Sequence, residues 1–325
     1  ASGGSNSISR YYYSSNNGSS WVNSTSSSYT FTNLSPGTRY TFRVYVTDTR
    51  GYSSSQRTVS ATTNNPIILA DYIKGLYTSD GANGIYLHDG QGTYGSQEAG
   101  DKSYRYSGTN PNNYVCFGTD AATCPNDNLY RIIGVFNNQV KLIKNNSYGN
   151  YAWSGSNSNV WNTTTKPSIY TTLNTNFYNS IGAVWRQKIS STTWQIGGLS
   201  NGLGTPKNIY TYELGSNNAN ITETMYIGLM YLSDYAYAAD PDNWNLNLED
   251  FSSISSANWL YTSFRVWTIS KNSSNTSSIW TMTRGYSESC LSQYTAEVKP
   301  TFYLNSNVAF SGGSGTSSDP YRLVV

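Results

Sequence analysis

The N-terminal part of the chain contains short segments in which apolar and polar side chains alternate. These segments lie at residues 8–14, 28–34, 38–48 and 56–63. A period of two is typical of strands that bury one face of a sheet. The pattern therefore predicts an N-terminal domain built of β-strands.

The segment at 38–48 places its apolar side chains on one face. These side chains belong to Tyr40, Phe42, Val44 and Val46. The alternate positions are mostly polar, so we expect a sheet with one buried and one solvated face. We therefore predict that Phe42, Val44 and Val46 are buried.

The stretch NLSPGTRYTFRVYVTD, residues 33–48, combines a corner with this long strand. Leu34, a Pro-Gly turn and then Tyr40 form a pattern that resembles the corner between strands E and F of the fibronectin type III family. The resemblance implies that Leu34 and Tyr40 are structural residues. It also implies that the Tyr40 hydroxyl is hydrogen-bonded to the backbone upstream.

The same resemblance implies strands C, C′, E, F and G, and so an incomplete fibronectin type III sandwich. The seven residues before Ile8 are too few for strands A and B of that family. A sandwich without these strands has an uncovered apolar face and an open strand edge. We expect a longer form of the same chain, or a neighbouring copy of it, to cover this face by β-strand addition.

A change of pattern marks the domain boundary. Pro66 follows two asparagines, and a new pattern begins after it. We assign residues 1–63 to the first domain, 64–69 to a linker and 70–325 to a second domain. Residues 67–79 place apolar side chains near helical spacing and predict a short helix.

The clearest hairpin of the second domain lies at residues 128–146. Both faces of its strands carry apolar side chains, on either side of a turn at Asn137 and Asn138. Such a hairpin is expected at the centre of a domain. The stretch before it, 80–128, has Gly, Asn or Asp every few residues and predicts loops with single short strands.

The best amphipathic helix is predicted near residues 166–182. Its apolar positions are Ile169, Leu173, Phe177 and Ile181, which recur every four residues. Further strands are predicted at residues 191–199, 223–239, 258–270 and 277–286, and in the C-terminal stretch. The fold class is thus mainly β with few helices, and the second domain is α+β and loop-rich.

The composition supports a β-rich, folded protein. Charged residues are 12%, aromatic residues are 15%, and 30 residues are tyrosine. Disorder goes with few aromatic residues and high net charge, so the chain is expected to fold. The net charge of +2 gives no argument for nucleic acid. No apolar run is long enough for a membrane span.

The sequence predicts no enzyme. The chain has one histidine, His88, in a turn context where we expect a surface hydrogen-bonding role. No nucleophile elbow, zinc-protease helix or phosphate-binding loop is present.

The densest acidic group lies in SDYAYAADPDNWNLNLED. It supplies Asp240, Asp242 and Asp250 as candidate ligands for Ca²⁺, the one cofactor that the sequence leaves open. The alternative is a solvated loop that uses aspartate and proline for its turns.

Three cysteines are present. Cys116 and Cys124 bracket seven residues, and we predict a disulfide between them; the alternative is two free thiols. Cys290 is left unpaired. A zinc site is disfavoured because such sites use four nitrogen or sulfur ligands.

Glycan binding is the second functional hypothesis. Sugars stack on aromatic rings, and Trp153, Trp161 and Trp244 lie in stretches rich in Asn and Ser. These three residues are the candidate ligand contacts.

Residues 70–325 resemble uncharacterised surface proteins of gram-positive gut bacteria, many of which look like type IV pilins. The matching stretches include NNYVCFGTD, CPNDNLYRIIGVFNNQVKLIK, YIGLMYLSDYAYAA and NWLYTSFRVWTIS. The order of hairpin, helix and Trp-rich strands is similar to C-type-lectin-like folds.

These resemblances imply an extracellular structural or adhesive protein of the bacterial cell surface, in a pilus-like filament. Its expected partners are copies of itself or a longer form of the chain. Host or bacterial glycans are the partners under the lectin-like alternative.

Overall fold

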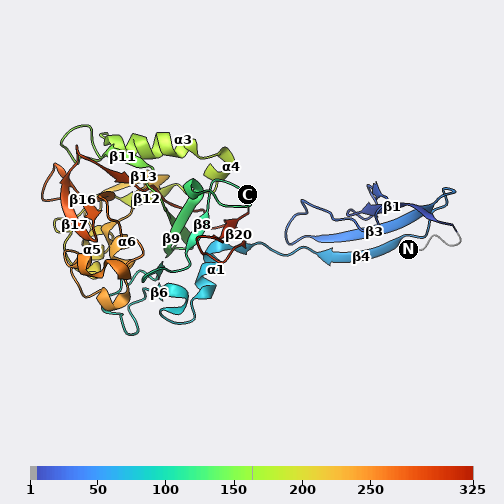
Figure 1. The fold of residues 1–325 in the computed structure, drawn as a ribbon, viewed down its shortest axis with the longest axis horizontal. Coiled ribbons are helices and arrows are strands. Elements are labelled where there is room, and N and C mark those ends of the chain that lie inside the picture. Colours follow the sequence, from blue (N-terminus) through green and yellow to red (C-terminus); the bar gives the residue numbers. More distant parts are fainter. Residues whose placement is uncertain (1–5, 163, 325) are drawn as a thin grey trace. The chain divides into compact units, whose positions relative to one another are not determined.

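The computed structural model describes residues 6–162 and 164–324. The chain forms two compact units, Ala1–Pro66 and Ile67–Val325. It is mainly β, and within the described residues the helices all belong to the second unit (Figure 1). The division falls within residues 64–69, the stretch that the sequence assigns to a linker.

The N-terminal unit is a single antiparallel sheet of four strands in its described part, in the order β2-β1-β3-β4. The strands are β1 (Ile8–Ser14), β2 (Val22–Ser24), β3 (Arg39–Asp48) and β4 (Arg57–Thr62). The predicted strands at 8–14, 38–48 and 56–63 are therefore confirmed. The strand predicted at 28–34 is wrong.

Serine side chains account for the missing strand. The Ser26 N–H donates to the Ser24 hydroxyl at 3.0 Å, and the Ser28 N–H donates to the Ser26 hydroxyl at 3.2 Å. Local bonds of this kind compete with a strand ladder for backbone groups. Strand β2 pairs with β1 just before this stretch instead.

The corner at Tyr40 has the predicted geometry. The Ser35 N–H donates to the Tyr40 hydroxyl at 2.9 Å. The Thr63 hydroxyl donates to the Ser35 carbonyl at 2.6 Å and ties the end of β4 to the same corner. Tyr40 is thus a structural residue that fixes the entry into β3.

The face of β3 predicted to be solvated carries aromatic packing of its own. Tyr45 lies opposite Tyr12 in the register of β1 and β3, and their rings stack with centroids 4.6 Å apart. Trp21 meets Tyr45 edge-on, with ring centroids 4.7 Å apart. The single sheet therefore has aromatic residues on both faces. Cross-strand pairs of these residues stabilise the sheet, which has no second layer packed on it among the described residues of this unit.

The largest sheet of the C-terminal unit has seven strands among the described residues. Its order is β14-β19-β10-β9-β7-β6, and β8 also pairs with β9. Its strands are β6 (Ile85–Leu87), β7 (Tyr104–Tyr106), β8 (Tyr114–Cys116), β9 (Leu129–Phe136), β10 (Gln139–Lys144), β14 (Ile227–Gly228) and β19 (Thr301–Tyr303).

The predicted hairpin lies inside this sheet as β9 and β10. Its turn residues Asn137 and Asn138 have φ of 47° and 64°, the left-handed conformation that a two-residue hairpin turn requires. Nearly every residue of both strands is buried. The prediction of a central hairpin is confirmed.

The other strands form three smaller sheets. A five-stranded sheet has the order β11-β18-β15-β16-β17, β12 pairs with β13, and the third has the order β21-β20-β5. Their bounds are β5 (Ile67–Ile68), β11 (Gly149–Ala152), β12 (Thr192–Gln195), β13 (Thr222–Met225), β15 (Val266–Lys271), β16 (Ser278–Thr283), β17 (Tyr286–Leu291), β18 (Thr295–Val298), β20 (Ala309–Gly312) and β21 (Arg322–Leu323).

Short helices connect these sheets. They are α1 (Leu69–Leu76), α2 (Ser168–Thr171), α3 (Tyr178–Ser180), α4 (Ala183–Arg186), α5 (Pro206–Glu213) and α6 (Leu232–Tyr237), with 3-10 turns at Ala82–Gly84, Asn126–Asn128, Pro241–Asn243 and Phe251–Ala257. The helix predicted near 166–182 is present as α2, a π-helical turn (Thr172–Phe177) and α3. Its four predicted apolar positions are all buried.

The strand prediction for 223–239 is only half right. The run forms β13 and β14 and then turns into helix α6. Every residue of α6 is buried, so its sequence lacks the alternation of apolar and polar faces that identifies an amphipathic helix. Likewise, the strand predicted at 258–270 begins only at Val266.

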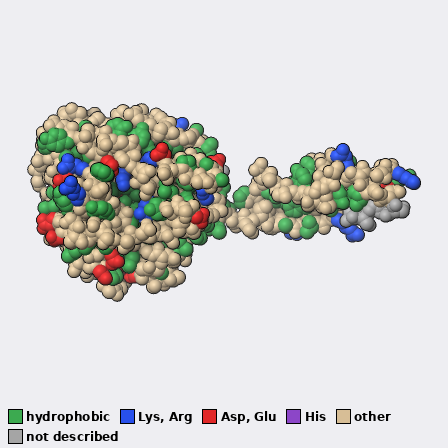
Figure 2. All heavy atoms as spheres, in the orientation of Figure 1, with side chains coloured by type: hydrophobic (Ala, Val, Ile, Leu, Met, Phe, Trp, Pro, Cys, Tyr) green, Lys and Arg blue, Asp and Glu red, His purple; other side chains and the backbone are tan. Residues whose placement is uncertain are grey.

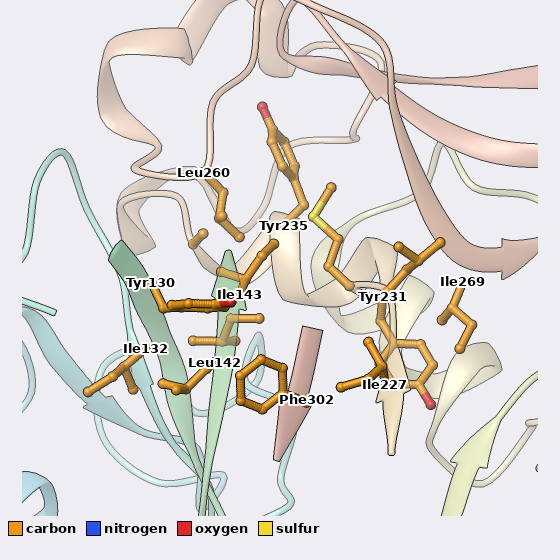
Figure 3. Packing of buried hydrophobic residues seen from close by; sticks show 14 of the residues in the cluster. Tyr130, Ile132, Leu142, Ile143, Ile227, Tyr231, Tyr235, Leu260, Ile269 and Phe302 are labelled. Atoms are coloured by element: carbon orange, nitrogen blue, oxygen red, sulfur yellow. The ribbon is translucent and has the colours of Figure 1, made fainter. Parts of the chain in front are cut away.

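The core of the C-terminal unit joins the large sheet to α6 and the five-stranded sheet. Figure 3 shows Leu142, Phe302 and Ile227, from three neighbouring strands of the large sheet. Tyr231 and Tyr235 lie close by, and these five residues are at most 3% exposed. Burial on this scale is the main source of stability for the unit.

The predicted disulfide is present. Cys116 at the end of β8 is bonded to Cys124, with Cα atoms 5.8 Å apart. Cys290 is free, as predicted, and it is buried. The Arg322 guanidinium donates to the carbonyls of Ala121 and Ala122 and so holds the loop that the disulfide closes.

Replacing Cys116 and Cys124 together with serine should lower the free energy of unfolding by about 2–3 kcal/mol, because a closed short loop restricts the unfolded chain. Urea unfolding of the two proteins measures the difference. Reductant should destabilise the wild type and leave the double variant unchanged. Equal stability of the oxidised wild type and the variant contradicts a stabilising role.

Candidate functional site

The sheet of the N-terminal unit carries an open apolar hollow. Its volume is about 420 Å³. The apolar residues around it include Tyr13, Phe31, Leu34, Phe42, Val44 and Val59. Figure 2 shows hydrophobic side chains reaching the surface of this unit.

The exposure of β3 and β4 corrects the prediction of a fully buried face. Val46 is 1% exposed, as predicted, whereas Phe42 and Val44 are only partly buried. Val59 on β4 is 64% exposed. No second layer of described residues in this unit covers the sheet here, so its apolar face stays in contact with solvent.

Aromatic rings extend this hollow into a continuous series. Tyr13 stacks on Tyr29 with centroids 5.4 Å apart, and Tyr29 meets Phe31 at 4.9 Å. Phe31 in turn lies 5.6 Å from Phe42, centroid to centroid. Such rings offer a large contact area at a small cost in conformational entropy, which suits a binding surface.

The three tryptophans predicted to bind a ligand are instead buried. Trp153 and Trp161 pack against each other in the main core, with centroids 5.6 Å apart, and each is at most 1% exposed. Trp244 is 1% exposed, and its indole N–H donates to the Ala239 carbonyl at 3.1 Å. The prediction was wrong because the loops around these rings fold them inward, where indole burial stabilises most.

His88 is buried rather than on the surface. The Ala99 N–H donates to His88 Nδ1 at 3.1 Å. Its ring packs between Tyr237 and Trp244, with centroids 4.6 Å and 4.9 Å away. Burial keeps the pKa of His88 well below its usual value, so the ring is neutral and serves packing.

Two of the three acidic residues predicted to bind Ca²⁺ accept hydrogen bonds instead. Asp240 accepts a hydrogen bond from the Asp242 N–H at 3.2 Å, at the start of a 3-10 turn. The Asp242 carboxylate accepts the Tyr94 hydroxyl at 2.7 Å, and this bond raises the pKa of Tyr94 to about 12. Asp250 precedes another 3-10 turn as its N-cap. Within residues 6–162 and 164–324, no three His, Cys, Asp or Glu side chains are placed to hold a metal ion.

A cluster of buried charges lies in the C-terminal unit, and sequence reasoning missed it. Lys141 on β10 and Asp234 on α6 form an ion pair, with Nζ 2.5 Å from Oδ2. Arg105 on β7 pairs with Asp101 at 2.7 Å. A signal was present, because Lys141 and Asp234 are charged residues inside mostly apolar stretches.

The electrostatics of this cluster follow from its burial. Burial lowers the pKa of Lys141, although the pairing with Asp234 opposes this shift. Burial alone would raise the pKa of Asp101, but Arg105 and hydrogen bonds from Ser103 bring it down to about 2. Each ion is thus paired with an opposite charge, and the side chains of Arg105, Lys141 and Asp234 are each 1% exposed.

A second buried carboxylate, Glu213, caps helix α6. It accepts the N–H groups of Leu232 and Ser233 at 3.0 Å and 2.9 Å and a hydrogen bond from the Ser270 hydroxyl. Burial raises the pKa of Glu213. These bonds satisfy the first amides of the helix and fix the position of Asp234 within its first turn.

Comparisons with known proteins identify the N-terminal unit only. Residues 4–62 match the fibronectin type III domain family. No curated protein matches the chain. No solved structure matches it either. No helix of the described residues is long and apolar enough to span a membrane.

The acid stability of the C-terminal unit should depend on Asp101. The pKa of Asp101 is lower in the folded protein than in the unfolded chain, where it is about 4, so the ionised carboxylate stabilises the fold above about pH 4. This stabilisation of about 2 kcal/mol is lost as the pH falls to about 2. Asp101→Asn removes the titrating group. Urea unfolding measures the free energy of unfolding at about pH 5 and about pH 2. Between these two values it should fall by about 2 kcal/mol more for the wild type than for the variant. Equal losses contradict this assignment.

Proposed function

We propose that this chain is a non-enzymatic structural and adhesive protein of the bacterial cell surface. In this proposal it is a subunit of a pilus-like filament, and the neighbouring copy covers the sheet of its N-terminal unit. The observation that carries the proposal is the open aromatic hollow on that sheet. Residues 4–62 match the fibronectin type III domain, which is common in extracellular and adhesive proteins.

The hollow suits the addition of a strand. An apolar face without a second layer is a typical interaction site, since its burial releases water from apolar surface. Strand β4 is an edge strand, and all its residues are exposed. An extended segment can therefore pair with this edge through its backbone and place alternate side chains in the hollow.

The charge distribution favours a second copy in a head-to-tail arrangement. The N-terminal unit has five arginines and one aspartate, a net charge of +4, and the C-terminal unit has 15 basic and 17 acidic residues, a net charge of −2. Two N-terminal units repel each other, whereas an N-terminal unit attracts the C-terminal unit of the next copy. A head-to-tail contact that does not close into a ring produces a filament.

The disulfide supports an extracellular location. Cys116 and Cys124 are bonded, and disulfides persist mainly in oxidising environments. The resemblance of residues 70–325 to pilin-like surface proteins supports the same proposal. The three tryptophans predicted for glycan binding are buried, so we assign the glycan-binding alternative to the aromatic series of the N-terminal unit.

Val59→Lys tests the proposal at the rim of the hollow. Val59 is 64% exposed on an edge strand, where lysine is tolerated, so the variant should fold. Electron microscopy and light scattering should show concentration-dependent assembly of the wild type and its loss in Val59→Lys. Tyr52→Ser is the matched control, because Tyr52 is 72% exposed in the same unit and does not line the hollow.

Two outcomes contradict assembly through this face. One is a wild type that stays monomeric at every concentration, and the other is a Val59→Lys variant that assembles normally. A glycan array probed with the same proteins distinguishes glycan binding from assembly. A monomeric wild type that binds glycans, with binding lost in Val59→Lys, assigns the hollow to sugars.

A further inference from the structure

Two reactive side chains from distant parts of the sequence meet in the core of the C-terminal unit. Lys141 and Asp234 are 93 positions apart, and Nζ lies 2.5 Å from Oδ2. Their side chains are each 1% exposed. An amine and a carboxyl group are therefore held together out of contact with water.

As an ion pair, this contact leaves polar atoms without partners. Asp234 Oδ1 and Arg105 Nη1 are both buried without a hydrogen bond, and they lie 3.8 Å apart. Burying charges costs several kcal/mol per ion, which attraction offsets only when the other polar atoms are also satisfied. The ion pair alone is a poor account of this site.

Aromatic side chains surround the amine of Lys141. The ring centroids of Tyr231, Tyr303 and Trp194 lie 4.5 Å, 5.2 Å and 5.3 Å from Lys141 Nζ. Aromatic walls exclude water, and burial lowers the pKa of Lys141. A desolvated, neutral lysine amine is a nucleophile, and a protonated carboxyl group is its electrophile.

We propose that Lys141 and Asp234 form an intramolecular amide bond between Nζ and Cγ. The cross-link would join strand β10 to helix α6 inside one chain. This inference does not depend on the proposed function, because it concerns the covalent structure of the C-terminal unit alone.

The reaction balances without an oxidant or a reductant. A proton passes from the ammonium group of Lys141 to the carboxylate, and the amine lone pair then attacks Cγ. The bond between Nζ and Cγ forms, the bond between Cγ and Oδ2 breaks, and Oδ2 leaves as water with two hydrogens from the original ammonium group. The only products are the amide and one water molecule.

The residues around Asp234 fit each stage of this reaction. Arg105 Nη1 faces Oδ1, where negative charge develops when the amine adds, and stabilises that charge. The Tyr231 N–H donates to Oδ2 at 2.8 Å and holds the leaving oxygen in place. Glu213 is a positioning residue, since it fixes the first turn of α6.

Fixed geometry lowers the barrier to this reaction. Groups held in the reactive orientation behave as if their concentration were about 10⁵ M or more. In the product, the amide carbonyl oxygen Oδ1 still faces Arg105 Nη1. Water that could hydrolyse the amide is kept out by the same aromatic side chains.

Intact-mass spectrometry of the folded, disulfide-reduced protein tests the proposal. The expected mass is that of the sequence less one water molecule, and it should persist in denaturant. After proteolysis, a branched peptide should contain both Lys141 and Asp234. Lys141→Met should restore the full sequence mass and abolish the branched peptide.

Lys144→Met is the matched control. Lys144 lies on the same strand and is also buried, but its Nζ donates to the backbone carbonyl of Asp127, which cannot react in this way. This variant should keep the mass deficit.

A wild type with the full sequence mass overturns the proposal, and so does a deficit that survives Lys141→Met. The wild-type measurement decides the matter even where Lys141→Met fails to fold.

Discussion

The contact between Lys141 and Asp234 joins the large sheet of the C-terminal unit to helix α6. Lys141 stands in a central strand of the large sheet, and Asp234 lies in the first turn of α6, a helix with no exposed residue. Around this contact, Arg105 and Asp101 form a second pair, and Glu213 caps the helix. Since a buried charge without its partner is strongly destabilising, the arrangement of sheet and helix depends on these groups staying together.

The N-terminal unit is stabilised in a different way. It has one sheet, and Val46 is among its few buried apolar side chains. Cross-strand aromatic pairs such as Tyr12 and Tyr45, and the hydrogen bond at the Tyr40 corner, hold the strands in register. These interactions order the sheet but leave its apolar hollow open. The C-terminal unit thus has an extensive buried core, whereas the N-terminal unit leaves an apolar surface exposed.

Local patterns in the sequence predicted much of the fold. Three of the four period-two strands of the first unit, the Asn137-Asn138 hairpin, the helix at 166–182 and the disulfide are present, and all depend on neighbouring residues. Helix α6 was missed because a fully buried helix and a buried strand are both continuous apolar runs. The burial of Trp244 and the pairing of Lys141 with Asp234 depend on contacts far along the chain. A single sequence does not specify such contacts, although a lone charge within an apolar run is a usable signal.

The chemical state of Lys141 Nζ tests the central claim most directly. Heteronuclear NMR of the protein with isotope-labelled lysine reports how many hydrogens this nitrogen carries and what it is bonded to. The account predicts an amide-type nitrogen with one hydrogen, coupled through the bond to the Asp234 carbonyl carbon. An ammonium- or amine-type nitrogen with no such coupling would contradict it.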